Sequence, residues 1–168
     1  MSTHNLSQPL PLPGNRTIII GIDSITKHGL QSSPVLGWAM RQFLVPGDTL
    51  LVVHASKSLD SNAAGAGYTN VMSPELLKTL EHTVEGVVRD MCRNAWGDAG
   101  VESQKVKAHV VKGDPRDTIK TLATEENATA VIVGRRGSVG AVKRALLGSV
   151  SDFLARELSA TVIIVKGD

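Results

Sequence analysis

Residues 130–149 read AVIVGRRGSVGAVKRALLGS, a short apolar run that passes directly into a glycine-rich segment. Residues 130–133 are apolar at successive positions, which is typical of a parallel strand covered on both faces. The glycines that follow let backbone N–H groups approach an anion closely, because they tolerate positive φ and carry no side chain. The stretch therefore predicts a buried strand whose carboxyl end opens into a loop suited to phosphate.

Four other apolar segments repeat the strand pattern. Three are rich in β-branched residues and read TIIIGI at 17–22, TLLVVHA at 49–55 and TVIIV at 161–165. The fourth, 106–111, alternates with Lys105, Lys107 and His109, which predicts a strand with one wet face or edge.

Segments with helical spacing of apolar residues separate these strands. They lie within residues 35–43, 77–95, 119–123 and 146–158. Ser73-Pro74 and Asp114-Pro115 are start signals, a capping residue followed by proline. We expect a polar loop after residue 22 and a helix end before Gly97. Strands that alternate with helices predict an α/β fold, doubly wound, with a parallel sheet covered on both faces.

Composition limits the class of protein. The chain has 168 residues, 42% hydrophobic, which is enough for one domain, here expected at 16–168 after a disordered leader at 1–15. A net charge of +2 provides no basic stripe for nucleic acid. No secretory signal or membrane span is evident, and a single cysteine, Cys92, excludes an internal disulfide framework, so we expect a cytoplasmic protein.

The predicted parallel sheet indicates where a ligand would bind. In open parallel sheets ligands bind outside the carboxyl ends of the strands, which nominates Asp23, Ala55, Gly113 and the glycine-rich loop. Gly148-Ser149 adds a hydroxyl and the N–H groups of a helix start. A tight turn without a ligand is the alternative for these glycines. Neither a Walker A loop nor a Rossmann G-x-G-x-x-G is present.

The glycine-rich segment nevertheless resembles a known signature. Gly134-Arg135-Arg136-Gly137, followed by AVKRALLGSVSD at 141–152, resembles the signature of the universal stress protein family. Nucleotide-binding members of that family carry G-x2-G, nine residues, then Gly-Ser or Gly-Thr. The resemblance extends over 16–166 and includes Asp23, His54-Ala55 and Gly113-Asp114-Pro115.

The resemblance implies a fold and a ligand. The fold would be adenine nucleotide alpha hydrolase-like, a five-stranded parallel sheet of order 3-2-1-4-5. The ligand would be ATP, or AMP or ADP, with Mg²⁺. Carried over by position, Ile22 and Asp23 meet the adenosine, Ala55 reads the adenine through its backbone, and Val133-Gly134 approach the ribose. The phosphates would be held by Gly137, Gly148, Ser149 and Val150.

The chain departs from this signature in one respect. Ten residues, 138–147, separate Gly137 from Gly148, and one additional residue can displace donors by up to about 3.5 Å along the chain. Other roles stay open from sequence. Asp23 binds a ligand or caps the following loop, and Arg135 and Arg136 neutralise phosphates or are only solvated. His54, at the end of a buried strand, is interpreted as a hydrogen-bonded core imidazole.

Two functions follow. The first is an ATP-binding stress-response regulator with at most slow ATP hydrolysis. The alternative is a dimeric interaction module of the same fold that binds no nucleotide. An efficient enzyme is not expected, since no nucleophile, base and orienting group can be assembled from the sequence. A homodimer is expected through Thr161 to Val165, because an apolar strand at a sheet edge invites pairing with another chain.

Overall fold

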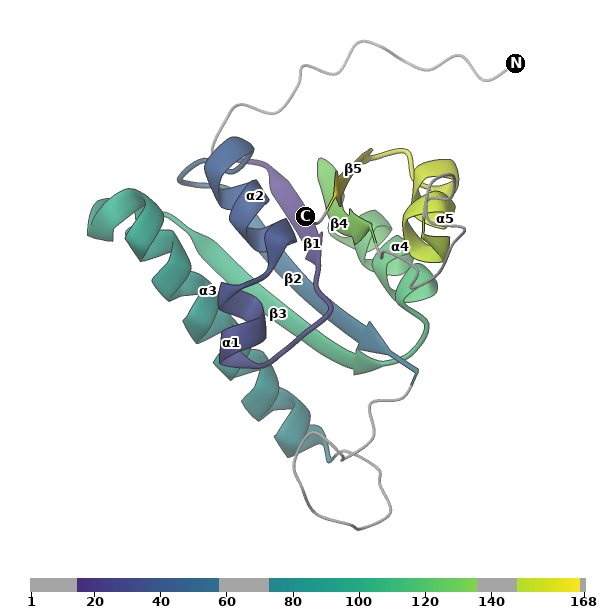
Figure 1. Ribbon diagram of the computed structural model, residues 1–168, viewed down its shortest axis with the longest axis horizontal. Coiled ribbons are helices and arrows are strands. Elements are labelled where there is room, and N and C mark those ends of the chain that lie inside the picture. Colours follow the sequence, from purple (N-terminus) through teal and green to yellow (C-terminus); the bar gives the residue numbers. More distant parts are fainter. Residues whose placement is uncertain (1–14, 58–72, 136–147, 167–168) are drawn as a thin grey trace.

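The computed structural model describes residues 15–57, 73–135 and 148–166 of the chain (Figure 1). Its five strands are β1 (Thr17–Gly21), β2 (Thr49–Ser56), β3 (Lys105–Lys112), β4 (Ala130–Arg135) and β5 (Thr161–Lys166). They form one parallel sheet of order β3-β2-β1-β4-β5, which confirms the expected fold. Residues 1–14 of the expected leader and the glycine-rich loop from Arg136 to Leu147 lie outside the described residues.

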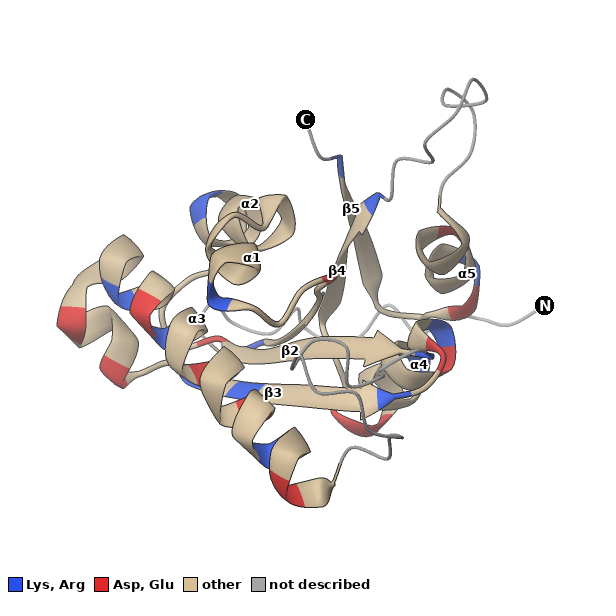
Figure 2. Ribbon diagram, turned by 60° about the horizontal axis from the view of Figure 1, so that its bottom comes forward, with Lys and Arg blue, Asp and Glu red and all other residues tan. Residues whose placement is uncertain are grey.

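Helices cover both faces of the sheet (Figure 2). α1 (Lys27–Gln31), α2 (Pro34–Gln42) and α3 (Pro74–Glu102) lie on one face, and α4 (Pro115–Glu125) and α5 (Ser149–Glu157) lie on the other. The side chains of β1 alternate between the two faces, so Ile18 and Ile20 enter one core and Ile19 the other. The continuous apolar runs of the sequence reflect this double coverage.

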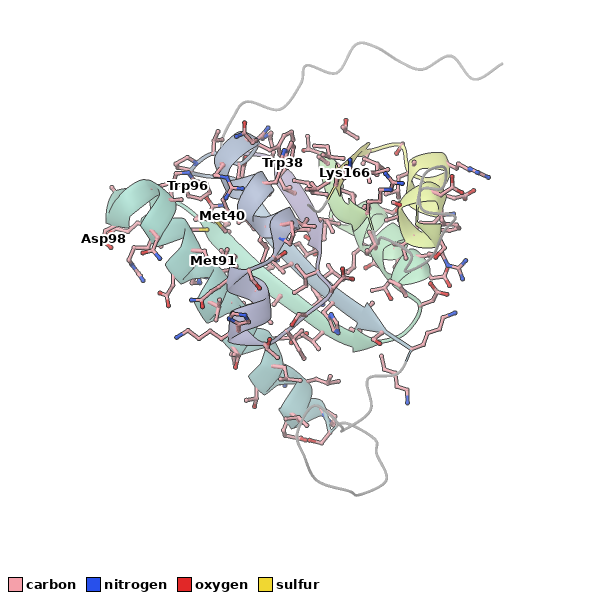
Figure 3. The ribbon with its side chains drawn as sticks, viewed as in Figure 1. Trp38, Met40, Met91, Trp96, Asp98 and Lys166 are labelled. Atoms are coloured by element: carbon pink, nitrogen blue, oxygen red, sulfur yellow. The ribbon has the colours of Figure 1, made fainter. Side chains whose placement is uncertain are left out.

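The larger core lies under α1, α2 and α3. Leu36, Ala39, Val88 and Cys92 are fully buried there. Met40 is also buried in this cluster, and Trp38, Met91 and Trp96 pack against it; Figure 3 shows the four side chains gathered about α2 and α3. The smaller core, under α4 and α5, contains Ile119 and Leu154 together with inner residues of β1, β2 and β4. This second core forms the wall of the candidate site described below.

Two local expectations were incomplete. The segment after β1 is not only a polar loop, because it contains α1, a helix of five residues capped by Thr26 with Leu30 as its buried residue. The expected helix end before Gly97 is present, but a short helical segment follows it. The chain breaks there with φ 74°, a conformation that favours glycine, and then resumes helical geometry up to Glu102.

A buried ion pair lies at the amino end of the sheet. The Arg16 guanidinium donates to both carboxylate oxygens of Asp48, at 3.0 and 2.6 Å, and to the Phe43 carbonyl at 2.9 Å. Asp48 is fully buried and also accepts from the Val45 N–H at 3.0 Å. The hydrogen bond to Asp48 raises the pKa of Arg16, so the guanidinium stays charged. The pair joins the residue before β1 to the residue before β2.

The free edge of β3 is covered by side chains of α3. The N–H groups of Ala108 and Val110 donate to the carboxylates of Glu85 and Glu81, at 3.0 and 3.1 Å, and Arg89 donates to the Val106 carbonyl at 3.4 Å. Residues four apart on a helix advance about 6 Å and residues two apart on a strand about 6.6 Å, so the two series stay matched. The edge therefore presents few groups for pairing with another strand.

We expect removal of this cover to cause association. The double variant Glu81→Ala/Glu85→Ala exposes the two N–H groups, and sedimentation velocity should then show concentration-dependent species larger than those of the parent protein. The variant Glu75→Ala/Glu102→Ala removes the same charge from the two ends of α3 and is the matched control. Identical sedimentation of the two variants would show that the carboxylates do not protect the edge.

The opposite edge of the sheet is formed by β5, as expected from the sequence. Its central residues, Val162 to Ile164, are only partly buried. No helix of the described residues is long and apolar enough to cross a membrane.

Cys92 is a buried thiol of the larger core, and burial raises its pKa to about 11. A free cysteine ionises near pH 8.5, so between these values the unfolded chain releases a proton that the folded chain keeps. Stability is therefore expected to fall as pH rises from about 8.5 towards 11.

The same burial makes Cys92 unreactive in the folded protein. At pH 8 we expect a disulfide-exchange reagent such as DTNB to modify Cys92 only as fast as the protein unfolds, and to react at once in concentrated urea. Equal rates with and without urea would show that the thiol is accessible.

Candidate functional site

A cavity of about 120 Å³ lies at the carboxyl edge of the sheet, between the ends of β1, β2 and β4 and the start of α5. Strand ends, the first residues of α4 and the first turn of α5 line it: Gly21, Ile22, Asp23, Val53, Ala55, Pro115, Ile119, Val133, Gly134, Gly148, Ser149, Val150 and Ser151. Its position is the one that the ligand rule for open parallel sheets predicts.

Gly21 keeps the floor of this cavity open. A Cβ at this position would lie 3.0 Å from Val133 Cγ1 and 3.3 Å from Ile119 Cδ1. The chain then leaves the sheet, and the Ile22 N–H still donates to the Val53 carbonyl at 2.9 Å. Asp23 follows as an exposed residue at the cavity.

His54 fixes the spacing of two strand ends. Its Nδ1 lies 3.1 Å from the Ile22 carbonyl, so the ring N–H donates to that oxygen. The contact confirms the expected hydrogen bond of His54, but the imidazole is only partly buried and does not belong to the core. It ties the segment Ile22-Asp23 to the end of β2, where the next residue, Ala55, lines the cavity.

The N-terminus of α5 differs from that of the other described helices. α1 to α4 are each capped by a side chain that accepts a backbone N–H: Thr26, Ser33, Ser73 and Asp114. The cap position of α5 is Gly148, with no side-chain cap hydrogen bond, and the Ser151 hydroxyl donates instead to the Gly148 carbonyl at 2.9 Å. The first N–H groups of a helix have no partner within it and carry partial positive charge, so this end suits an anion.

A second cavity, of about 360 Å³, adjoins the first and shares Ala55, Pro115, Ser149 and Val150 with it. The other described residues that line it are Ser56, Lys57, Asp114 and Arg116. Asp114 caps α4 by accepting from the Arg116 N–H at 2.9 Å. Its carboxylate also accepts from the Arg116 side chain, at 3.0 and 2.7 Å, and from Lys57 at 2.8 Å.

These contacts set the charge of the second cavity. The Arg116 side chain, followed by Lys57, holds the pKa of Asp114 well below its usual range, and Asp114 in turn raises the pKa of Arg116. Among the described residues that line the cavity, two are therefore cations and one is an anion at neutral pH. The guanidinium of Arg116 also lies over the Phe153 ring, 5.8 Å from its centroid, which directs it towards α5.

The structure brings most of the sequence-predicted residues to one place. Eight of them line the first cavity: Ile22, Asp23, Ala55, Val133, Gly134, Gly148, Ser149 and Val150. Arg136 and Gly137, predicted to meet the phosphates, lie outside the described residues. Whether any of these residues contacts a ligand stays a prediction.

Sequence reasoning missed other lining residues. Pro115 and Ile119 were interpreted only as a helix start and a core position, yet both line the first cavity. The Gly113-Asp114-Pro115 motif after β3 was the available signal for α4. Lys57 and Arg116 were missed because what they share is an ion pair with Asp114. Lys57 is 57 residues away from Asp114 in the sequence, and Arg116 is two residues away. The parts of the chain that the structure describes contain no cluster of three His, Cys, Asp or Glu that could hold a metal ion.

The chain is similar in sequence to one protein family and in fold to solved structures. The family model described as "Universal stress protein family" matches residues 14–166. No curated protein is matched. Among solved structures, a universal stress protein in complex with cAMP has 20% identity and a TM-score of 0.55, with 91% of this chain and 98% of that chain covered.

Two further solved structures have the same fold. A universal stress protein family protein from Arabidopsis thaliana with AMP bound has 13% identity and a TM-score of 0.55, and covers 92% of this chain and 93% of its own. A universal stress protein from Archaeoglobus fulgidus has 20% identity and a TM-score of 0.53, with coverage of 90% and 94%. At these identities the likeness concerns the fold.

Proposed function

The chain belongs to the universal stress protein family, and we propose that it is a regulatory protein of the cytoplasm that binds an adenine nucleotide, ATP, in the cavity at the carboxyl edge of the sheet. Solved relatives of the same fold carry cAMP and AMP, which supports this class of ligand. In this proposal the nucleotide serves as the signal of a stress response.

The residues around the cavity fit the parts of a nucleotide. Ile22, Val53 and Ile119 offer apolar surface for a base and a sugar, and the backbone at Ala55 offers polar groups that can read the edge of adenine. Asp23 is an exposed carboxylate that can accept from ribose hydroxyls. Gly148, Ser149 and Val150 offer the start of α5 to the phosphates, together with Gly137 from the signature.

The single observation that carries the proposal is the start of α5. It is the one helix start among the described residues without a side-chain cap, and it lies on the same cavity as Asp23 and Ala55. A phosphate would supply the acceptors that a capping side chain supplies to the other helices.

Magnesium would accompany the phosphates, which supply oxygen ligands of the kind that it prefers. We assign a regulatory role and at most slow ATP hydrolysis. Of the carboxylates that line the two cavities, Asp114 is engaged by Arg116 and Lys57, and Asp23 lies exposed. Neither is placed as a buried general base.

Isothermal titration of nucleotide-stripped protein with Mg-ATP tests the proposal. We expect binding in the micromolar range, and ATP or a related nucleotide released when the protein as purified is denatured. The absence of both heat and co-purified nucleotide would contradict the proposal. The additional residue between Gly137 and Gly148 would then prevent the loop from binding phosphate. A dimeric interaction module that binds no nucleotide would be the better account.

We also propose that two copies of the chain associate through β5. The other edge of the sheet is covered by Glu81, Glu85 and Arg89, whereas the central residues of β5 are apolar and only partly buried. Sedimentation equilibrium at micromolar concentration should give the mass of a dimer. A monomer at that concentration, or a dimer that persists when Ile163 is replaced by lysine, would contradict this interface.

A further inference from the structure

The end of β2 carries backbone groups that the neighbouring strand does not use. β2 extends past the end of β1, to the point where the chain of β1 leaves the sheet (Figure 1). In a parallel pair, every second residue of a strand directs both its N–H and its carbonyl towards the same neighbour. The Thr49 N–H donates to the Arg16 carbonyl at 2.8 Å. The Val53 carbonyl accepts from the Ile22 N–H at 2.9 Å, so the odd-numbered residues of β2 face β1, and Ala55 is the last of them.

The next bond of this ladder would join the Ala55 N–H to the Ile22 carbonyl, and it does not form. No backbone group of the described residues pairs with the N–H or the carbonyl of Ala55. The Ile22 carbonyl accepts instead from Nδ1 of His54 at 3.1 Å. Ala55 therefore keeps one unpaired donor and one unpaired acceptor at the first cavity, which it lines.

We propose that His54 is a positioning residue for the base of the nucleotide: its ring N–H occupies the Ile22 carbonyl, so that the N–H and the carbonyl of Ala55 are left for the base. This inference rests on the proposed function, because it needs a base in the first cavity. Backbone carbonyls away from water are rarely left without a donor. Without the imidazole, the Ile22 carbonyl would therefore take the Ala55 N–H and extend the ladder by one bond.

His54 acts from the opposite face of the sheet. Side chains alternate along a strand, and Val52 enters the larger core whereas Val53 enters the smaller one. The side chain of His54 therefore lies on the face of the larger core, and that of Ala55 lies on the face of the cavity. His54 is not among the described residues that line either cavity. Its effect on a ligand has to pass through Ile22 and Ala55.

The two backbone groups of Ala55 favour one kind of base. Adenine carries a donor, the N6 amino group, beside an acceptor ring nitrogen, whereas guanine has the acceptor O6 in place of the amino group. The carbonyl can accept from the amino group but not from O6. A site that pairs with both groups of a ligand discriminates against an analogue that leaves one of them unpaired. Loss of the Ala55 N–H to the ladder would weaken this discrimination.

Amide hydrogen exchange of the nucleotide-free protein, followed by NMR, tests the arrangement without a ligand. By the register of β1 and β2, the Val53 N–H faces the Ile20 carbonyl and serves as the reference for a paired amide. We expect the Ala55 amide to exchange at least about tenfold faster than that of Val53, and His54→Leu to slow it towards the rate of Val53. An Ala55 amide that is as protected as that of Val53 in the parent, or unchanged in His54→Leu, would overturn the proposal.

Isothermal titration with Mg-ATP and with Mg-GTP tests the consequence for a ligand. We expect the parent to bind ATP at least about tenfold more tightly than GTP, and His54→Leu to lose about tenfold in ATP affinity with little change for GTP. His54→Asn carries its amide nitrogen at the position of Nδ1 and should retain most of the preference. His54→Gln carries it at the position of Nε2 and should behave like His54→Leu. His109→Leu, in the neighbouring strand β3, is the matched control and should leave the ratio unchanged.

The ratio of the two affinities separates positioning from a general loss of stability, because a distorted site would weaken both nucleotides alike. Equal losses of ATP and GTP in His54→Leu, or His54→Asn and His54→Gln variants that do not differ, overturn the positioning role while the nucleotide site stands. A parent protein that binds neither nucleotide overturns both. If His54→Leu does not fold, the comparison of His54→Asn with His54→Gln and the exchange of the parent decide.

Discussion

Replacement of Ser149 by proline is expected to weaken ATP binding by roughly 10- to 150-fold while the domain stays folded. Ser149 is the first residue of α5, and its backbone N–H has no partner within the helix. Proline removes this donor and the hydroxyl together. A hydrogen bond to a charged group contributes about 1.5–3 kcal/mol, and each 1.4 kcal/mol corresponds to a factor of ten in Kd.

The backbone at this position accepts proline. Proline suits the first position of a helix, and α2, α3 and α4 each begin with one: Pro34, Pro74 and Pro115. The residue before proline prefers extended backbone, and Gly148 already has φ −59° and ψ 152°. The thermal transition of the variant should therefore match that of the parent.

Ser149→Ala is the matched control for this variant, because it removes the hydroxyl and keeps the N–H. We expect it to lose much less ATP affinity than the proline variant in the same titration. If the proline variant melts normally and binds ATP like the parent, the start of α5 is not the phosphate site.

Replacement of Asp48 by alanine is expected to destabilise the domain by about 3–5 kcal/mol. The variant leaves the Arg16 guanidinium, only 17% exposed, without its charged partner, and the Val45 N–H loses its acceptor. Typical domains are stable by only about 5–15 kcal/mol, so the midpoint of urea unfolding should fall sharply.

The pair of Arg93 and Asp90 provides the comparison. Its atoms are 2.7 Å apart, almost as close as those of Arg16 and Asp48, but its side chains are 50% and 68% exposed. Exposed ion pairs contribute about 0–1 kcal/mol, so Asp90→Ala should leave the unfolding midpoint nearly unchanged. Equal losses in the two variants would show that burial does not decide the strength of the Arg16–Asp48 pair.

The strands and their order could be predicted because their signals are local or come from a specific motif. Continuous apolar runs such as TLLVVHA at 49–55 indicate burial on both faces, and the signature at Gly134 implies the order of the sheet. α1 was missed because its five residues include one buried side chain, Leu30, which gives no helical period. The pair of Arg16 and Asp48 joins residues 32 apart, and nothing in the sequence indicates such a contact.

The candidate site could be predicted where residues follow strands directly. Asp23, Ala55 and Gly134 were identified from the ends of strands, and the structure places them on one cavity. Lining residues that belong to helices carry a core or capping signal instead, so Ile119 and Arg116 were not identified. The covered edge of β3 was also hidden, because Glu81 and Glu85 have the spacing of an ordinary solvated helix face.

The central claim is that an adenine nucleotide occupies the cavity between the strand ends and the start of α5, and an NMR titration of ¹⁵N-labelled protein with Mg-ATP tests it most directly. We expect the amide signals of Ile22, Asp23, Ala55, Ser149 and Val150 to shift together as one saturable process, with those of Lys105 and Thr49 at the amino end of the sheet unchanged. Shifts confined to other surfaces, or no saturable shift at millimolar Mg-ATP, would contradict the account.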